Sequence, residues 1–304
     1  MPDLAILYEH PKWFEALFAV LERRGIRFEA IRLSDHRFDP AAAALPAPVI
    51  LSRVAMSSFL RESDHGIFYA QSLLAHWAAR GARVLNGADV LAIDSSKARQ
   101  LSLITGLGLS IPDTRVVHRP DDLVAAAQTM RYPLLVKANI GGSGAGIVGY
   151  SSEAELAASV RDGSTPDSID KVLLVQDYAP ARGGVITRIE TLGGKFLYAI
   201  EVETGESFDL CPADACLAAP GRTAIKMTAV TPAPAIIEAA ERIAHAVGMD
   251  VGGVELLIDD RDGVARFYDI NALSNFVASP LDVLGWDPHE RLVDYIAAAI
   301  EEVR

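Results

Sequence analysis

The sequence predicts a mixed α/β and α+β fold. Apolar strands and striped helices alternate over about the first 90 residues, while paired strands with tight turns prevail afterwards. The chain has 304 residues, of which 50% are hydrophobic and 22% charged, as in domains that fold throughout. A chain of this length favours two or three compact units, so we expect a doubly wound N-terminal unit, two α+β units and a cleft between them.

The first unit is predicted over residues 1–92. Each apolar strand is followed by a helical pattern, and Gly25 closes the first helix, which favours parallel strands with crossover helices. The predicted strands are Leu4–Tyr8, Phe28–Leu33, Val49–Ser52 and Arg83–Leu85, and the predicted helices are Pro11–Arg24 and Phe68–Ala79.

Two further units are predicted over residues 93–170 and 171–304. Asp94 or Ser95 can cap a helix that ends near Leu107, and the polar stretch Asp162–Asp170 is a loop at the boundary. Hairpins are expected to turn at Gly193-Gly194 and at Asp260–Gly263. The other predicted strands are Thr114–Val117, Pro133–Ala138, one ending at Tyr150 and Val172–Val175, and the other predicted helices are Asp121–Met130, Glu153–Arg161, Pro234–Val247 and Pro288–Val303.

Charge and cysteine content limit the binding partners and the cellular compartment that we expect for the protein. A net charge of -12 argues against a nucleic-acid or anionic-membrane surface. The longest apolar stretch, Ala41–Leu51, holds two prolines and is shorter than the roughly 20 residues that cross a bilayer, and the N-terminus has no secretion signal. With only Cys211 and Cys216, we expect a cytoplasmic protein, and a homodimer is the default oligomer.

A glycine-rich loop follows the apolar strand that ends at Lys137. Gly141, Gly142, Gly144 and Gly146 surround Ser143, so backbone N–H groups can approach a phosphate while the lysine adds a positive charge. No Gly-Lys-Ser or Gly-Lys-Thr ends the loop, which excludes a P-loop, and the loop leads into a strand rather than a helix, which excludes the dinucleotide fingerprint. A flexible hairpin loop is the alternative. Lys97 by itself is typical of a solvated surface lysine.

Two predicted strands joined at Asp260–Gly263 carry oxygen-bearing side chains. Period-2 alternation places Asp269 and Asn271 on one face, and antiparallel pairing brings Glu255 beside them. Mg²⁺ prefers such ligands together with nucleotide phosphates. The alternative is an acid at a strand edge beside a turn-forming asparagine. Facing carboxylates repel unless a cation separates them, which favours the metal site.

In order and spacing these features resemble the ATP-grasp superfamily. The resemblance is strongest to its glutathione-synthetase-like branch, which includes the ribosomal-protein glutamate ligases, and covers roughly residues 49–271. It is carried by NGADVLAIDSSKARQ, PLLVKANIGGSGAGI and LLVQDYAP. The resemblance implies an ATP-grasp fold, in which two α+β subdomains enclose ATP and the glycine loop closes as a lid.

The resemblance also implies roles for individual residues. Arg188 would stabilise the transferred phosphate, with Lys137 as the second catalytic cation, and Arg53 would face the substrate. Glu255, Asp269 and Asn271 would hold magnesium, with two ions expected and Mn²⁺ as an alternative metal. The implied ATP-binding residues are Lys97, Lys137, Gly141, Gly142, Ser143, Gly144, Gly146, Gln176, Asp177 and Tyr178.

The resulting hypothesis is an ATP-dependent carboxylate–amine ligase. It would activate a small carboxylate as an acyl phosphate, release ADP and phosphate, and form an amide with an amino acid or short peptide. Two alternatives remain open. One is an ATP-grasp carboxylating enzyme, and the other is a catalytically inactive ATP-binding sensor or partner module. Removing Asp269 should abolish turnover in an enzyme and merely weaken nucleotide binding in a sensor.

The sequence departs from the family pattern at three places. The metal strand carries Asp269 where the family usually has a glutamate. The following segment lacks the usual Pro-Gly, so Ser274 and Asn275 become candidate substrate contacts. Phe208–Cys216 stands where the glutamate ligases have arginines and contains two acids, which argues against glutamate and for a substrate with a cationic group.

Overall fold

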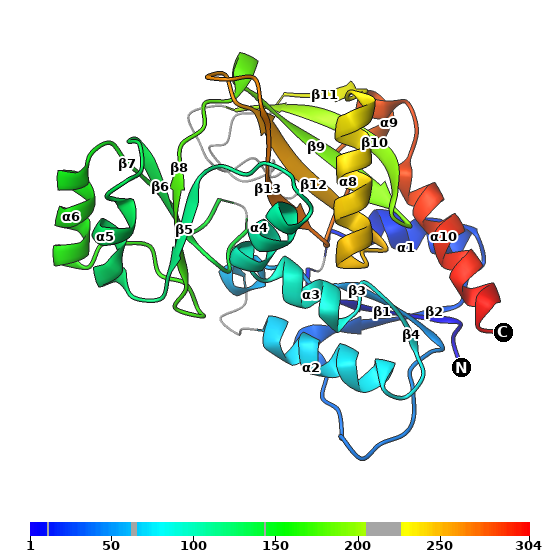
Figure 1. The fold of residues 1–304 in the computed structure, drawn as a ribbon. Coiled ribbons are helices and arrows are strands. Elements are labelled where there is room, and N and C mark those ends of the chain that lie inside the picture. The colour runs from blue at the N-terminus through cyan, green and yellow to red at the C-terminus, as the bar shows by residue number, and fades with distance from the viewer. Residues whose placement is uncertain (11, 62–65, 143, 205–225) are drawn as a thin grey trace.

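The computed structural model describes residues 1–10, 12–61, 66–142, 144–204 and 226–304. These residues form three sheets that surround a common centre (Figure 1), as the mixed α/β and α+β prediction requires. The strand orders are β2-β1-β3-β4, β5-β8-β6-β7 and β11-β10-β9-β12-β13. The predicted segment Phe208–Cys216 lies outside the described residues.

The N-terminal sheet is parallel and doubly wound. Alternate residues of β1 face opposite sides, so Leu4 and Ile6 pack against helices α1 and α10 while Ala5 and Leu7 pack against α2. The sheet contains β1 (Leu4–Tyr8), β2 (Phe28–Arg32), β3 (Val49–Arg53) and β4 (Arg83–Leu85), and its helices are α1 (Glu15–Arg23), α2 (Gly66–Ala78) and the C-terminal α10 (Pro288–Glu302).

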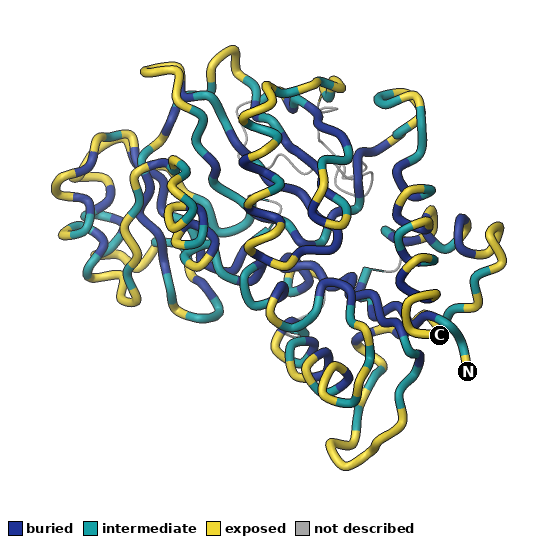
Figure 2. The backbone as a smooth tube through the Cα atoms, turned by 45° about the vertical axis from the view of Figure 1, so that its right-hand side comes forward, coloured by how far each residue is buried: buried dark blue, intermediate teal, exposed yellow. Residues whose placement is uncertain are grey.

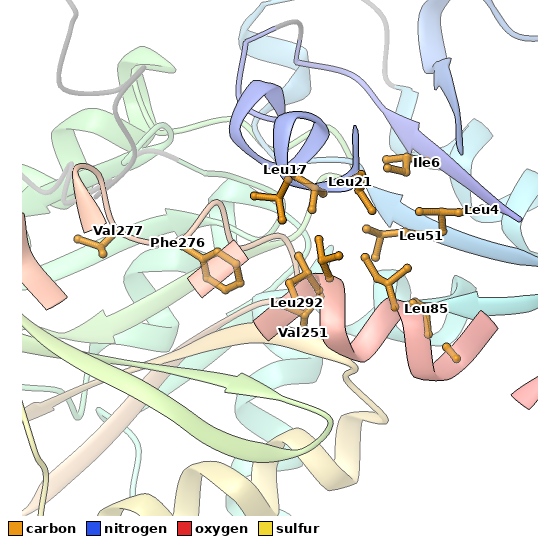
Figure 3. Close-up of a cluster of buried hydrophobic side chains, with 14 of the residues drawn as sticks. Leu4, Ile6, Leu17, Leu21, Leu51, Leu85, Val251, Phe276, Val277 and Leu292 are labelled. Atoms are coloured by element: carbon orange, nitrogen blue, oxygen red, sulfur yellow. The ribbon is translucent and has the colours of Figure 1, made fainter. Parts of the chain in front are cut away.

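A single apolar cluster joins the N-terminal sheet to the C-terminal part of the chain. Figure 3 shows Leu17, Leu21 and Leu51 beside Val251 and Leu292, and all five side chains are buried. In Figure 2, buried stretches of the backbone, in dark blue, gather in the middle of the molecule. Because α10 covers one face of the first sheet, that sheet shares its core with the end of the chain.

The central sheet is antiparallel and carries two short helices on its outer side (Figure 1). Its strands are β5 (Thr114–Val117), β6 (Leu134–Ala138), β7 (Ile147–Tyr150) and β8 (Leu173–Asp177), and its helices are α5 (Leu123–Ala127) and α6 (Glu153–Asp162). Strand β8 lies between β5 and β6. The boundary predicted after residue 170 is therefore placed too early, because it would separate β8 from both hydrogen-bonded neighbours.

The C-terminal sheet is antiparallel, and α8 packs on one of its faces. Gly193 and Gly194 have φ of 58° and 73°, so the first predicted hairpin turn is confirmed, and β12 and β13 form the second hairpin. The elements are β9 (Val185–Leu192), β10 (Lys195–Glu203), β11 (Met227–Val230), α8 (Pro234–Val247), β12 (Val251–Ile258), β13 (Ala265–Asn271) and α9 (Pro280–Leu284).

Two helices, α3 (Ala88–Asp94) and α4 (Lys97–Gly106), link the first two sheets. The predicted cap at Asp94 or Ser95 is wrong, because α3 ends at these residues and the extended Ser96 caps α4 by accepting from the Arg99 N–H at 3.3 Å. Helix α3 also crosses the boundary predicted at residue 92.

Single-turn 3₁₀ helices occur at Leu33–Asp35, Ser58–Leu60, Pro120–Asp122 and Arg182–Gly184. Among the described helices, none is long and apolar enough to cross a membrane.

Candidate active site

A cavity of about 560 Å³ lies where the three sheets meet. Its volume is in the range of small-molecule sites, and its wall combines apolar side chains with a few charged groups. Most residues singled out from the sequence line it. They are Lys97, Lys137, Gly141, Gly142, Gly144, Gln176, Asp177, Tyr178, Arg188, Glu255, Asp269, Asn271 and Asn275.

A row of charged side chains crosses the C-terminal sheet at the cavity. Arg188 on β9 is paired with Glu255 on β12, and Glu255 is paired with Asp269 on β13, so the three side chains share one face. The Arg188 guanidinium lies 3.1 Å from Glu255 Oε1. Burial, with the negative charge of Asp269 added, raises the pKa of Glu255 above its ordinary value despite the opposing effect of Arg188.

The carboxylates suit a divalent cation, as expected from the sequence. Glu255 and Asp269 are paired across neighbouring strands, and Asn271 Nδ2 lies 3.2 Å from Glu255 Oε1. With a cation between the carboxylates, rotation of the amide would present its oxygen to the cation in place of the NH2 group, which now donates to Glu255. Within the described part of the chain, no three His, Cys, Asp or Glu side chains gather as a metal site, so an amide completes this set. Two acids and an amide oxygen match the preference of Mg²⁺.

The two lysines meet this row from helix α4 and strand β6. Lys97 Nζ, at the start of α4, lies 2.6 Å from Asp269 Oδ1, and this ion pair raises the lysine pKa although burial alone would lower it. Lys137 Nζ lies 5.6 Å from the centre of the Tyr268 ring. Burial, together with the nearby Lys97 charge, lowers the Lys137 pKa to about 8. Lys97 and Lys137 thus line the same cavity as Glu255 and Asp269.

Asn139 explains why the two lysines come together. It follows β6, and its Oδ1 accepts from the Ala98 N–H at 2.9 Å while its backbone carbonyl accepts from the Lys97 N–H at 3.3 Å. Its Nδ2 donates to Asp170 at 2.6 Å. The end of β6 is therefore fastened to the first turn of α4.

The glycine loop closes one side of the cavity. A Cβ at Gly142 would lie 3.0 Å from Ser57 Cβ, so the loop contacts the N-terminal unit closely. Gly146 has φ of 74° and packs on Ala138, where a Cβ would come within 2.7 Å. Gly146 is outside the cavity wall, so its contribution is to the turn rather than to direct contact with a nucleotide. Ser143 lies outside the described residues.

The predicted adenine hinge lies at the end of β8. Gln176 Nε2 donates to Thr114 Oγ1 at 2.9 Å, so this side chain is already engaged within the sheet. Asp177 forms a 2.6 Å ion pair with Arg261. Tyr178 remains 41% exposed at the edge of the cavity. The backbone N–H groups of Asp177 and Tyr178 also donate within the protein, to the carbonyls of Asp113 at 2.8 Å and Pro133 at 3.2 Å.

Arg53 and Ser274 occupy positions different from those expected. Both are buried and neither lines the cavity. The Arg53 guanidinium donates to the Ser274 carbonyl and lies 5.5 Å from the centre of the Phe14 ring. Arg53 is thus placed to fix the loop after β13, and Asn275 is the member of that loop that reaches the cavity.

Sequence reasoning missed two buried acids beside this site. Glu190 is 1% exposed and accepts from Arg188 Nε at 2.6 Å. Its position two residues after Arg188 on a strand was the available signal, since alternate residues share a face. Asp94 lines the cavity, and burial raises its pKa to about 7 while the N–H groups of Ala272 and Leu273 donate to it. Its sequence position suggested only a helix cap.

Gly253 provides a test of how tightly the charged row is built. A Cβ there would lie 2.9 Å from Glu190 Oε1 and 3.0 Å from Arg188 Nε. We expect Gly253→Ala to displace Arg188, to lower kcat by about 100-fold and to cost about 1–3 kcal/mol of folding free energy. Gly106→Ala is the control, because a Cβ there meets nothing within 4 Å. Comparable kinetics for both variants would contradict this account.

The Lys137 pKa predicts a pH dependence of nucleotide binding. The ammonium form attracts phosphate, and bound phosphate would raise its pKa above the free-protein value of about 8. Affinity for ADP should therefore be constant below pH 8 and fall by up to tenfold per pH unit above it. Calorimetry between pH 7 and 9.5 tests this. Lys137→Met should bind more weakly and lose the pH slope, whereas a slope that persists in this variant would assign the titration elsewhere.

The fold is similar to that of solved ATP-grasp ligases. The ligase PsnB complexed with a phosphomimetic precursor variant, Mg and ADP superposes with a TM-score of 0.73, 14% identity, and coverage of 99% of this chain and 100% of that chain. The RimK domain ATP-grasp protein of Sphaerobacter thermophilus DSM 20745 gives a TM-score of 0.69 at 18% identity, covering 96% of this chain and 99% of that one. At these identities the likeness shows the fold, and it confirms the predicted one.

The sequence assigns the family within that class. A model of the RimK-like ATP-grasp domain matches residues 94–296. A probable alpha-L-glutamate ligase of Serratia proteamaculans (strain 568) is 29% identical over 237 residues, which cover 75% of this chain and 72% of the relative. The chain belongs to the RimK-like ATP-grasp family. It is an ATP-grasp ligase, a class that uses ATP and Mg²⁺ to form carbon–nitrogen bonds.

Proposed function

We propose that the cavity activates a carboxylate with the γ-phosphoryl group of ATP and passes the acyl group to an amine. One observation carries the proposal. A single cavity joins Lys97 and Lys137, beside the glycine loop, to the row of Arg188, Glu255 and Asp269. Phosphoryl transfer depends on positioning and fixed charge rather than on a protein nucleophile, and these side chains supply both.

The chemistry divides among the residues as follows. Lys137 and Lys97 hold the phosphates, and the backbone after β8 receives the adenine. The carboxylate oxygen attacks the γ-phosphorus and the bond to ADP breaks, while Arg188 stabilises charge on the transferred group. The amine then attacks the acyl carbon, phosphate leaves with the bonding electrons, and the amine proton passes to solvent or phosphate. Glu255, Asp269 and Asn271 would hold two Mg²⁺ ions, or Mn²⁺, which neutralise the phosphates.

The substrates are proposed to be small molecules. The Serratia relative is named as a glutamate ligase and PsnB was solved with a precursor, so amino acids and peptide segments are the classes to test. The cavity of about 560 Å³ accommodates a nucleotide and a compact acceptor. Bicarbonate as the activated acid remains the second candidate, and it would give ADP without an amide.

The test is substrate-dependent release of ADP and phosphate. The protein would be incubated with ATP, Mg²⁺ and pooled amino acids and small carboxylic acids, and mass spectrometry would search for condensed products. A new amide formed in step with ADP supports the proposal. Tight ATP binding with no pool stimulating turnover would favour a nucleotide sensor instead. Hydroxylamine trapping separates these cases, because an acyl phosphate yields a hydroxamate.

A further inference from the structure

One end of the cavity lies away from the hinge and is formed by the N-terminal unit and the loop after β13. The residues that line it there are Trp13, Ala55, Met56, Leu273 and Phe276. All five are apolar or aromatic. Ser57, Asn275 and the buried acid Asp94, which accepts from the Leu273 N–H, provide the neighbouring polar side chains. Apolar side chains thus dominate the end that would receive a substrate beyond the phosphates, and Asp94 adds an acid there that opposes a second carboxylate.

This wall is held in place before any ligand binds. The His10 ring stacks on Trp13 with centroids 4.3 Å apart and planes at 11°, and the Arg61 guanidinium lies 4.7 Å from the Trp13 ring centre. The backbone N–H of Trp13 also donates to His10 Nδ1 at 3.2 Å. A fixed aromatic wall loses little conformational freedom on binding, which favours discrimination by shape and polarity.

Lys12, which precedes Trp13, does not line the cavity, and the other cations near this end are already engaged among the described residues. Arg188 is paired with both Glu190 and Glu255, and Lys97 with Asp269. Arg61 is paired with Glu9, and Arg53 is buried away from the cavity wall. Lys137 lies beside Tyr268 at the phosphate side. No cation in the described part of the cavity wall is therefore left to hold a second carboxylate.

The segments outside the described ranges contain more acidic than basic residues, so their composition adds no excess of positive charge. Residues 62–65 include two acids, and residues 205–225 include three acids and one arginine. Burying a carboxylate without a partner is costly, whereas an apolar side chain gains by leaving water. The charge distribution thus opposes an acidic substrate at this end.

We propose that this end of the cavity binds an uncharged, apolar side chain, so that the ligase joins an apolar amino acid, or a peptide ending in one, rather than glutamate. The inference rests on the ligase function proposed above and adds its substrate class. A single methylene in an apolar pocket changes kcat/KM by about 10- to 200-fold, so a whole side chain gives a clear preference.

The first experiment measures this preference in the wild-type protein. Pairs drawn from leucine, methionine, phenylalanine, glutamate and lysine would be incubated with ATP and Mg²⁺, and ADP and dipeptides quantified. We expect pairs containing an apolar residue to react at least about 10-fold faster than pairs made only of glutamate and lysine.

Two variants assign the preference to this wall. Trp13→Ala should lower kcat/KM for the apolar substrate by about 10- to 200-fold while leaving the KM for ATP unchanged, which also shows that the variant is folded. Met56→Lys should raise the use of glutamate by placing a cation on the wall. Leu281→Ala removes a side chain that is 67% exposed and outside the cavity wall, and serves as the matched control.

The outcomes separate the inference from the function on which it rests. Preference for glutamate or lysine, or an unchanged apolar rate in Trp13→Ala, would overturn the substrate class while leaving the ligase intact. ATP binding with neither ADP nor a hydroxamate from any pair would overturn the ligase and the substrate class together. A ranking of apolar above charged residues, lost in Trp13→Ala alone, would establish the inference.

Discussion

Replacing Asp269 with alanine is expected to lower kcat by about 100- to 1000-fold or more. The carboxylate is paired with Glu255 across the strands and lies 2.6 Å from Lys97 Nζ. Its loss removes a proposed metal ligand and also the partner of a buried ammonium group, and charge-stabilising groups of this kind contribute losses of that size. Substrate-dependent ADP release is the measurement.

Controls distinguish this loss from a general effect of removing an acid. Asp269→Asn keeps the volume of the side chain and should also be inactive if charge is what matters. Asp167→Ala removes an acid that is 76% exposed and paired with Lys171, and such pairs contribute about 0–1 kcal/mol. Asp167→Ala should therefore behave as wild type. Activity in Asp269→Asn close to that of wild type would show that the negative charge of this residue is not needed for the reaction.

Replacing Arg188 with alanine should reduce both activity and stability. The guanidinium separates two buried acids, with Glu190 Oε1 at 2.6 Å and Glu255 Oε1 at 3.1 Å. Removing one partner of a buried ion pair costs about 3–5 kcal/mol, because the remaining charge has lost its compensation. We also expect kcat to fall by about 1000-fold, as for other cations that stabilise a transferred phosphoryl group. Urea unfolding and ADP release measure the two effects.

A double variant separates the two roles of Arg188. Arg188→Met combined with Glu190→Gln removes the charge of one acid together with the cation, so most of the lost stability should return. Activity should not return, because no cation then faces the transferred group. Recovery of activity in the double variant would show that Arg188 acts by supporting the sheet and takes no direct part in the reaction.

The sequence determined the local elements and the row of site residues. Strand alternation placed Asp269 and Asn271 on one face, and the hairpin placed Glu255 opposite, as the register confirms. The turn at residues 193–194 could also be predicted from the sequence, because a turn with two successive positive φ angles favours glycine at both positions. These features depend on residues close together along the chain, where periodicity and turn chemistry decide the outcome.

Contacts between distant segments were decided by the tertiary structure alone. Arg53 ends an apolar strand, and nothing in the neighbouring sequence indicates its hydrogen-bond partner. It is buried and donates to the Ser274 carbonyl, 221 residues away along the chain. Glu190 gains its role only because β12 carries Gly253 beside it, where the absent Cβ leaves room for the ion pair with Arg188. Trp13, which precedes α1, lines the same cavity as Phe276, which lies beyond β13 at the other end of the chain. Sequence patterns report periodicity within an element, whereas these positions depend on how elements pack, and packing is set by side chains that are far apart in the chain.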